Sequence, residues 1–152
     1  MSIIKHIREK ANQHNKVIVF PRSSDKRVIE AALYLQEKKL ATPVIIKNDR
    51  ETPLPDELHA IDPVSDERLK KYALSFYERR KHKGISEAEA IEIVKNPLFF
   101  GASMVASGDA DGCVAGSIST TGDVLRAAIQ TIGLKKDSNV VSSTFLMNFE
   151  DG

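Results

Sequence analysis

The feature that most constrains the fold of this sequence is an apolar run, a helical pattern and a second apolar run, all within the first third of the chain. The first run, residues 16–20, ends at Pro21 and is typical of a strand buried on both faces. Ser23-Ser24-Asp25 then offers N-cap chemistry for a helix that extends to about Leu40. The second run is residues 42–46. Together they predict a βαβ unit, whose crossover is right-handed almost without exception.

The rest of the sequence continues this alternation. Prolines exclude a long helix from residues 49–64, and Ser86 with Glu89 forms a capping box that opens a helix. The remaining pattern predicts a strand end at 61–63, helices over 65–82, 87–95, 98–107 and 123–132, a buried strand over 112–116, and a strand-like run over 139–147. Such alternation predicts an α/β fold with a mostly parallel sheet.

Length and charge narrow the class of protein. The chain has 152 residues, the size of one ordinary domain, and its 41% hydrophobic and 28% charged content is typical of a soluble globular protein. With 22 Lys and Arg against 21 Asp and Glu, the net charge of +1 argues against a general polyanion binder but does not exclude a local basic patch. After residue 100 only Arg126, Lys135 and Lys136 are basic, which predicts a surface that a partner or further chain covers.

Cysteine and histidine usage argues against disulfide and zinc chemistry. Cys113 is the single cysteine, expected as inert packing in a buried strand, and the histidines lack the spacing of zinc ligands. No orienting carboxylate is evident for His82, so it is not assigned as a general base. Basic residues interrupt every apolar stretch of the N-terminus, and no run approaches the ~18 apolar residues of a membrane span. We expect a reduced, cytoplasmic protein with no metal and no membrane partner.

A hydroxyl-rich loop follows the predicted strand 112–116. Ser119, Thr120 and Thr121 precede a helix, and ligands of open α/β sheets bind beyond the carboxyl ends of the strands. The unpaired N–H groups of the helix N-terminus suit a phosphate, and the hydroxyls add donors. Plain N-capping, with one hydroxyl closing the helix and the others in water, is the alternative.

A run of cationic side chains ends the predicted helix 65–82. Arg79, Arg80, Lys81, His82 and Lys83 are consecutive. Arginine gives planar, bidentate contacts to phosphate, so the run could grip a polyphosphate. Alternatively, it is a solvated helix C-terminus, where the dipole favours cations.

Arg126 lies one turn into the helix after the hydroxyl-rich loop, among apolar residues. Arginine is seldom buried without a partner, so a contact to an anionic ligand is one reading. Asp123, three residues earlier, offers a second one, an ion pair within the helix.

Several stretches occur in an order that resembles a known family. They are Arg80-Lys81-His82-Lys83-Gly84, Gly101-Ala102-Ser103-Met104-Val105, Ala110-Asp111-Gly112, Thr120-Thr121-Gly122-Asp123-Val124-Leu125-Arg126 and Ser142-Ser143-Thr144-Phe145-Leu146-Met147. In this order and spacing, from about residue 16 to 148, the chain resembles the N-terminal part of the phosphate acetyl/butyryltransferase family.

The resemblance implies both a reaction and binding residues. The family interconverts acetyl-CoA plus phosphate with acetyl phosphate plus CoA, and its members are two-domain α/β proteins, usually dimeric, with the substrates in the cleft. A three-layer α/β/α first domain is therefore expected. Arg80 and Arg126 match the family arginines associated with coenzyme A. Ser119, Thr120 and Thr121 fall in the loop facing the cleft, where phosphate or acetyl phosphate would be bound.

The resemblance also implies what this chain lacks. The family's catalytic Asp, Arg and Ser lie in the second half of a chain about twice this long, so no catalytic residue is expected here. Residues 1–138 would form the CoA/phosphate-side half, and 139–152 would start the crossover towards an absent second domain. We expect a truncated form that is inactive alone, exposes an apolar patch, and forms a homodimer or associates with the missing half.

Some residues depart from the family pattern, and other functions stay open. Arg22 and Ser23 stand where members tend to carry an acidic residue and a glycine, and Ser103, Gly122 and Ala127 also differ. One alternative is a non-catalytic CoA/phosphate-ligand module that associates with a partner chain, and another is a butyryl-specific member. RNA binding by the cationic run is disfavoured by the balanced charge and the lack of an aromatic platform, so no nucleic-acid partner is expected.

Overall fold

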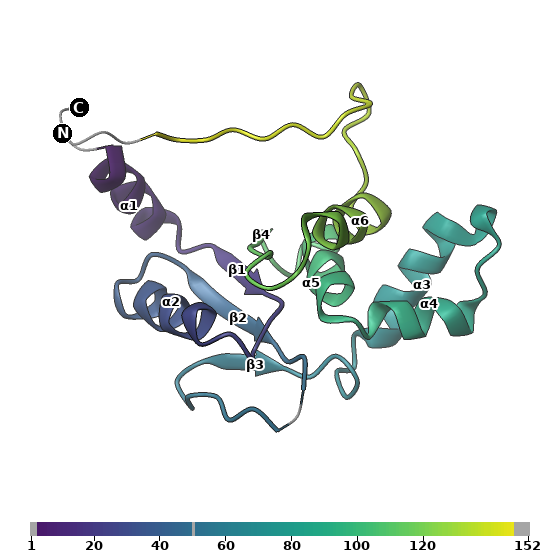
Figure 1. Cartoon of the computed structure of the whole chain (residues 1–152), viewed down its shortest axis with the longest axis horizontal. Coiled ribbons are helices and arrows are strands. Elements are labelled where there is room, and N and C mark those ends of the chain that lie inside the picture. Colours follow the sequence, from purple (N-terminus) through teal and green to yellow (C-terminus); the bar gives the residue numbers. More distant parts are fainter. Residues whose placement is uncertain (1–2, 50, 148–152) are drawn as a thin grey trace.

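The computed structural model describes residues 3–49 and 51–147, in which four parallel strands form one sheet (Figure 1). The strands are β1 (Val17–Phe20), β2 (Thr42–Ile46), β3 (His59–Ile61) and β4 (Gly112–Cys113). Their order is β3-β2-β1-β4, so β1 lies inside the sheet, with Val17 opposite Thr42 on β2 and Ile18 opposite Gly112 on β4. Parallel neighbours require crossovers. Helix α2 (Lys26–Glu37) supplies the one between β1 and β2, whereas the connection from β2 to β3 has no helix among its described residues, 47–49 and 51–58.

Helices cover both faces of this sheet. The described helices are α1 (Ile3–His14), α2 (Lys26–Glu37), α3 (Leu69–Arg80), α4 (Glu87–Val94), α5 (Pro97–Ala106) and α6 (Thr121–Thr131), with a 3₁₀ turn over Lys81–Lys83, and α1 is the one that buries no side chain. Side chains of a strand alternate between faces, so Val19 and Val44 meet α3, α4 and α5, whereas Phe20 and Ile45 meet α2. The expected three-layer α/β/α arrangement is confirmed. Among the described helices, none is both long and apolar enough to cross a bilayer.

Local sequence signals explain several helix starts. Asp25 caps α2 by accepting the N–H of Arg27, and the predicted capping box of Ser86 and Glu89 is present at α4. Asn96 caps α5 and is followed by a proline at the first helical position, where a missing N–H costs nothing. These caps satisfy backbone donors that the helices themselves leave unpaired.

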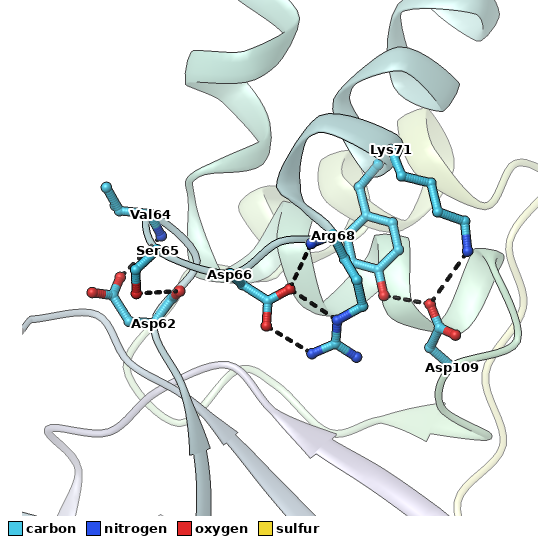
Figure 2. Close-up of polar contacts among 8 residues, drawn as sticks. Asp62, Val64, Ser65, Asp66, Arg68, Lys71 and Asp109 are labelled. Atoms are coloured by element: carbon cyan, nitrogen blue, oxygen red, sulfur yellow. Dashed lines mark hydrogen bonds and ion pairs between the residues drawn. The ribbon is translucent and has the colours of Figure 1, made fainter.

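A polar network fixes the start of α3 (Figure 2). Arg68 donates two hydrogen bonds to Asp66, at 2.9 and 2.8 Å, and they lower the pKa of that carboxyl. Nearby, the hydroxyl of the buried Tyr72 donates to Asp109, to which Lys71 also comes within 3.9 Å. Burial, followed by this hydrogen bond, raises the pKa of Tyr72. The network joins α3 to the turn after α5, so it has a structural role.

Two predicted strands differ from the structure. The buried strand over 112–116 is wrong in extent and burial, because β4 has only two residues, Cys113 is exposed, and Val114 is 58% exposed. β4 pairs with β1 alone in the described sheet, so one of its sides stays open. The predicted strand over 139–147 is also wrong, since this segment pairs with no strand of the described chain and lies extended away from α6 (Figure 1).

The C-terminal segment nevertheless confirms one expectation. Its apolar side chains are exposed, with Val140 at 71% and Phe145 at 87%. Helix α1 is an addition that the sequence pattern did not indicate, and none of its side chains is buried. Neither region packs its apolar side chains against the core of the described chain. An apolar pattern predicts secondary structure well only where such packing occurs, so these two regions were hard to predict.

Candidate functional site

The candidate site lies at the carboxyl edge of the sheet, where β1 and β4 end side by side. After β1, the N–H of Arg22 donates to the carbonyl of Phe20 at 2.9 Å, which turns the chain sharply across Pro21. After β4, the N–H of Val114 donates to the carbonyl of Val19 at 2.9 Å and starts the loop that leads to α6. Open α/β sheets bind ligands at this edge.

Two adjoining cavities occupy this edge. The first has a volume of about 270 Å³ and a mostly apolar lining, to which Phe20, Val28 and Leu98 contribute. The second, of about 290 Å³, is more polar and is lined by Arg22, Asn96, Ser119, Thr120, Asp123 and Arg126, among others. Arg22 and Ser119 line both cavities and therefore stand between them.

The residues of the hydroxyl-rich loop, 119–121, have different roles: one caps α6, and two line the cavities. Thr120 is the N-cap of α6, because its Oγ1 accepts the N–H of Asp123 at 3.1 Å and donates to the carboxylate of Asp123 at 2.7 Å. The capping alternative is thus confirmed for Thr120, although this residue also lines the polar cavity. Ser119 lines both cavities, and its Oγ accepts a hydrogen bond from Nη2 of Arg22 at 3.0 Å. Thr121 is the first residue of α6.

Arg126 reaches the same polar cavity from α6. Its Nη1 also pairs with Oδ1 of Asp123 at 3.3 Å, so the ion pair weighed from the sequence is present. The side chain of Arg126 is 62% exposed, and an exposed pair of this kind is worth only ~0–1 kcal/mol. An anionic ligand can therefore compete for this guanidinium.

Arg80 lies apart from the other predicted residues. It ends α3, is half-buried and lines neither cavity, and its side chain forms no hydrogen bond or ion pair with the described part of the chain. Its neighbour Arg79 lies near Gly133, just beyond the C-terminal end of α6, whereas Thr120 opens that helix. Eleven helical residues span ~16 Å, so the cationic run and the loop lie towards opposite ends of α6.

The rest of the cationic run is solvated. Lys81, His82 and Lys83 are exposed in the 3₁₀ turn after α3, and Lys81 pairs with Glu78 at 2.6 Å. This arrangement agrees with the alternative of a solvated helix C-terminus for these three residues.

Sequence reasoning missed two arginines of the site. Arg27 binds Asp25 at 2.9 Å and donates to the carbonyl of Ser117 at 3.2 Å, so it joins the start of α2 to the loop before α6. The Arg27 guanidinium and then the Ser117 hydroxyl lower the pKa of Asp25 to about 2. Arg22 meets Ser119 although the two are 97 positions apart in the sequence. Only the fold brings such partners together, so the sequence held no signal beyond the position of Arg22 after β1.

The loop that carries Arg22 is anchored to the neighbouring strand. Oδ1 of Asn48, just beyond β2, accepts hydrogen bonds from the N–H of Ser23 at 2.9 Å, the hydroxyl of Ser23 at 3.0 Å and the N–H of Ser24 at 3.1 Å. Ser23 is itself buried. One amide oxygen thus holds the whole turn in place.

Neither metal nor thiol chemistry is supported at this edge. Within residues 3–49 and 51–147, no three His, Cys, Asp or Glu side chains lie close enough together to hold a metal ion. Cys113 is exposed as a residue, but its Sγ faces Gly101 on α5. Burial raises the pKa of the Cys113 thiol to about 11, which keeps it protonated at neutral pH.

Known proteins are similar to this chain in both sequence and fold. The family described as "Phosphate acetyl/butaryl transferase" matches residues 2–152. The phosphate acetyltransferase of Acetivibrio thermocellus is 39% identical over 97% of this chain and 46% of its own length, and that of Thermoanaerobacterium thermosaccharolyticum is 39% identical over 97% and 47%. The structure of a phosphotransacetylase from Streptococcus pyogenes superposes with a TM-score of 0.88 at 33% identity, covering 99% of this chain and 49% of that one. The chain therefore spans about half the length of the curated relatives it matches.

Proposed function

Because the chain belongs to the phosphate acetyl/butyryltransferase family, we propose that it provides the coenzyme A and phosphate-binding side of a phosphate acetyltransferase. In that reaction the thiolate of coenzyme A attacks the carbonyl carbon of acetyl phosphate. A C–S bond forms, the C–O bond to the phosphoryl group breaks, phosphate leaves, and the thiol proton passes to a base. The reverse reaction makes acetyl phosphate from acetyl-CoA and phosphate.

The observation that carries this proposal is the meeting of Ser119, Thr120 and Arg126 around one polar cavity at the N-terminus of α6. A helix N-terminus and an arginine both favour a phosphate oxyanion. Ser119 and Thr120 supply hydroxyls, the first N–H groups from Thr121 onward supply backbone donors, and Arg126 supplies the charge.

Arg80 is proposed to bind a different part of the same ligand. Coenzyme A is long and carries more than one phosphate, so one molecule can extend from the N-terminus of α6 towards Arg80 near its far end. The side chain of Arg80 has no partner in the described chain, which leaves its guanidinium available. We propose coenzyme A or acetyl-CoA, phosphate and acetyl phosphate as the ligands and no metal as a cofactor.

Calorimetry with coenzyme A on the full chain tests the binding part of the proposal. We expect Arg126→Gln to weaken coenzyme A binding about tenfold or more, because the substitution removes a charge-assisted hydrogen bond to the ligand. The matched control is Lys10→Gln, which removes an exposed charge on α1, before the amino end of β1. Equal affinities of the two variants, or no binding at millimolar coenzyme A, would contradict the proposal.

An activity assay tests the catalytic part. No described residue of this chain is proposed as the catalytic base, so acetyl transfer by the chain alone should be negligible. Release of coenzyme A from acetyl-CoA and phosphate is the measurement. A turnover of about 1 s⁻¹ or more, in the range of ordinary enzymes, would show that the chain carries catalytic residues of its own.

A further inference from the structure

Among the three arginines at the carboxyl edge, Arg22 is paired differently from the others. Arg27 is bound by the carboxylate of Asp25, and Arg126 by that of Asp123. Arg22 has no carboxylate partner in the described chain, and its one side-chain hydrogen bond goes from Nη2 to the Ser119 hydroxyl.

The Nε–H of Arg22 is a donor without an acceptor. This atom is buried and forms no hydrogen bond within residues 3–49 and 51–147. A guanidinium group carries five N–H donors. Leaving a buried donor of a charged group without an acceptor costs free energy. An oxyanion that accepts this hydrogen bond would remove the cost. The remaining lining of the polar cavity carries Arg126 and Asp123, so with Arg22 the balance of charge is positive.

Arg22 also lies between the apolar cavity and the polar cavity. Arg22 lines both cavities. The apolar one, about 270 Å³ in volume, is lined by Phe20, Val28, Ala31, Leu98 and Val114, among others, with Arg27 and Ser117 at its polar side. An apolar cavity of about 150 Å³ already holds benzene. A ligand with an anionic end and an apolar or aromatic end therefore fits the pair of cavities better than a free anion does.

We propose that Arg22 is an anion-binding residue that holds the phosphoryl group of an organic phosphate where the two cavities meet, with the apolar part of the same ligand in the apolar cavity. This inference deepens the proposed function, on which it rests for the nature of the ligand. It adds a binding residue and a second compartment to the site. Ser119 positions Arg22 by accepting from Nη2, which leaves Nε to the ligand.

Titration of the full chain with phenyl phosphate and with inorganic phosphate tests both compartments. The phenyl group buries apolar surface, so phenyl phosphate should bind at least tenfold more tightly than phosphate. Arg22→Gln should weaken binding of both probes at least tenfold, and Arg22→Lys should restore part of the loss by returning the charge without the planar donor pair. Lys10→Gln is the matched control and should change neither.

A second variant tests the apolar compartment alone. Ala31 lies on α2 and lines only the apolar cavity, and leucine is a good helix former. Ala31→Leu should therefore lower the affinity for phenyl phosphate about tenfold and leave the affinity for phosphate unchanged. A thermal melt of each variant confirms that it is folded.

The outcomes separate this inference from the proposed function. If Arg22→Gln binds both probes as the unmodified chain does while Arg126→Gln loses coenzyme A, the inference is wrong and the proposed function stands. If the probes depend on Arg22 and Ala31 as expected but coenzyme A does not bind, the organic-phosphate site stands and the proposed function is wrong. Equal affinity for the two probes, or no binding of either, overturns the inference.

Discussion

Helices α5 and α6 pack against each other and are similar in length, yet they use their apolar residues differently. In α5 five consecutive residues, from Phe100 to Met104, are buried. In α6 only Ala127 and Thr131 are buried, while Leu125 and Ile129 are exposed. The difference indicates that α5 contributes more to the core, whereas α6 contributes to the candidate site through its N-terminus and the loop before it. Stability therefore depends mainly on α5, whereas the candidate site depends on the N-terminal ends of both helices, since Leu98 of α5 lines both cavities.

The largest effect expected from this contrast is that of Phe100→Ala. Phe100 is fully buried and meets Tyr72 edge to face, with ring centroids 5.1 Å apart. Its truncation should lower the free energy of unfolding by about 3–5 kcal/mol, measured by urea denaturation. Leu125→Ala on α6 is the control and should cost less than about 1 kcal/mol. Similar losses for both variants would mean that α6 supports the core as much as α5 does.

The Sγ of Cys113 faces Gly101 on α5 although the residue is exposed, which predicts slow chemistry at this thiol. Burial raises the pKa of this thiol from 9.0 to about 11, so at pH 8 the reactive thiolate should be about 100-fold scarcer than in an unfolded chain. Alkylation rates measured from pH 7 to 11 should still be rising at pH 10. The urea-unfolded chain is the control, with a midpoint near the ordinary thiol value. A midpoint near 9 in the folded chain would show that Sγ is open to water.

A methyl group added to α5 should be poorly tolerated. A Cβ on Gly101 would lie 3.0 Å from Cγ1 of the buried Val19, so this side chain or the helix would have to shift slightly. Overpacking costs ~1–3 kcal/mol, and the better helix propensity of alanine returns up to ~1 kcal/mol. Gly101→Ala should thus lower stability by about 1–2 kcal/mol. Adding Val19→Ala tests the cause, because the two losses should be less than additive if this contact is responsible.

The cap of α6 should matter less than the packing of α5. Thr120→Ala removes the acceptor for the N–H of Asp123 and should cost about 1 kcal/mol of unfolding free energy. Thr121→Ala deletes the neighbouring hydroxyl, which caps nothing in α6, and should be nearly neutral. If the two substitutions cost the same, the hydroxyl of Thr120 does not act as a cap.

The smallest effect, with the opposite sign, is expected for a methyl group added to α6. Within the described chain, a Cβ on Gly122 would come near one atom, Oγ1 of Thr120, at 3.8 Å, which is an ordinary van der Waals contact. Gly122→Ala should therefore raise the unfolding free energy by about 0.5–1 kcal/mol. Thermal melts of the alanine variants at Gly101 and Gly122 should shift in opposite directions. A shared direction would remove the distinction between the two helices.

The sequence alone was sufficient where short-range rules decide the structure. The capping box at Ser86 depends on neighbours in the sequence and was predicted correctly. The strand Thr42–Ile46 was also predicted correctly, because its apolar run finds partners in β1 and β3. The run 139–147 was apolar enough for a strand, but strands need partners for their backbone groups, and none is present in the described chain. In the candidate site, Ser119, Thr120 and Arg126 could be foreseen because they lie in one loop and helix. Arg22 could not, because its burial and its contact depend on residues far along the chain.

The three hydrogen bonds on Asn48 have a kinetic consequence. They fix the turn that carries Arg22 when the protein folds, so the entropy of ordering that turn is lost before any ligand arrives. A ligand then needs no loop closure to engage Arg22, and its association should run near the rate of simple diffusional docking. Differences in affinity among related anions should accordingly be found in their dissociation rates.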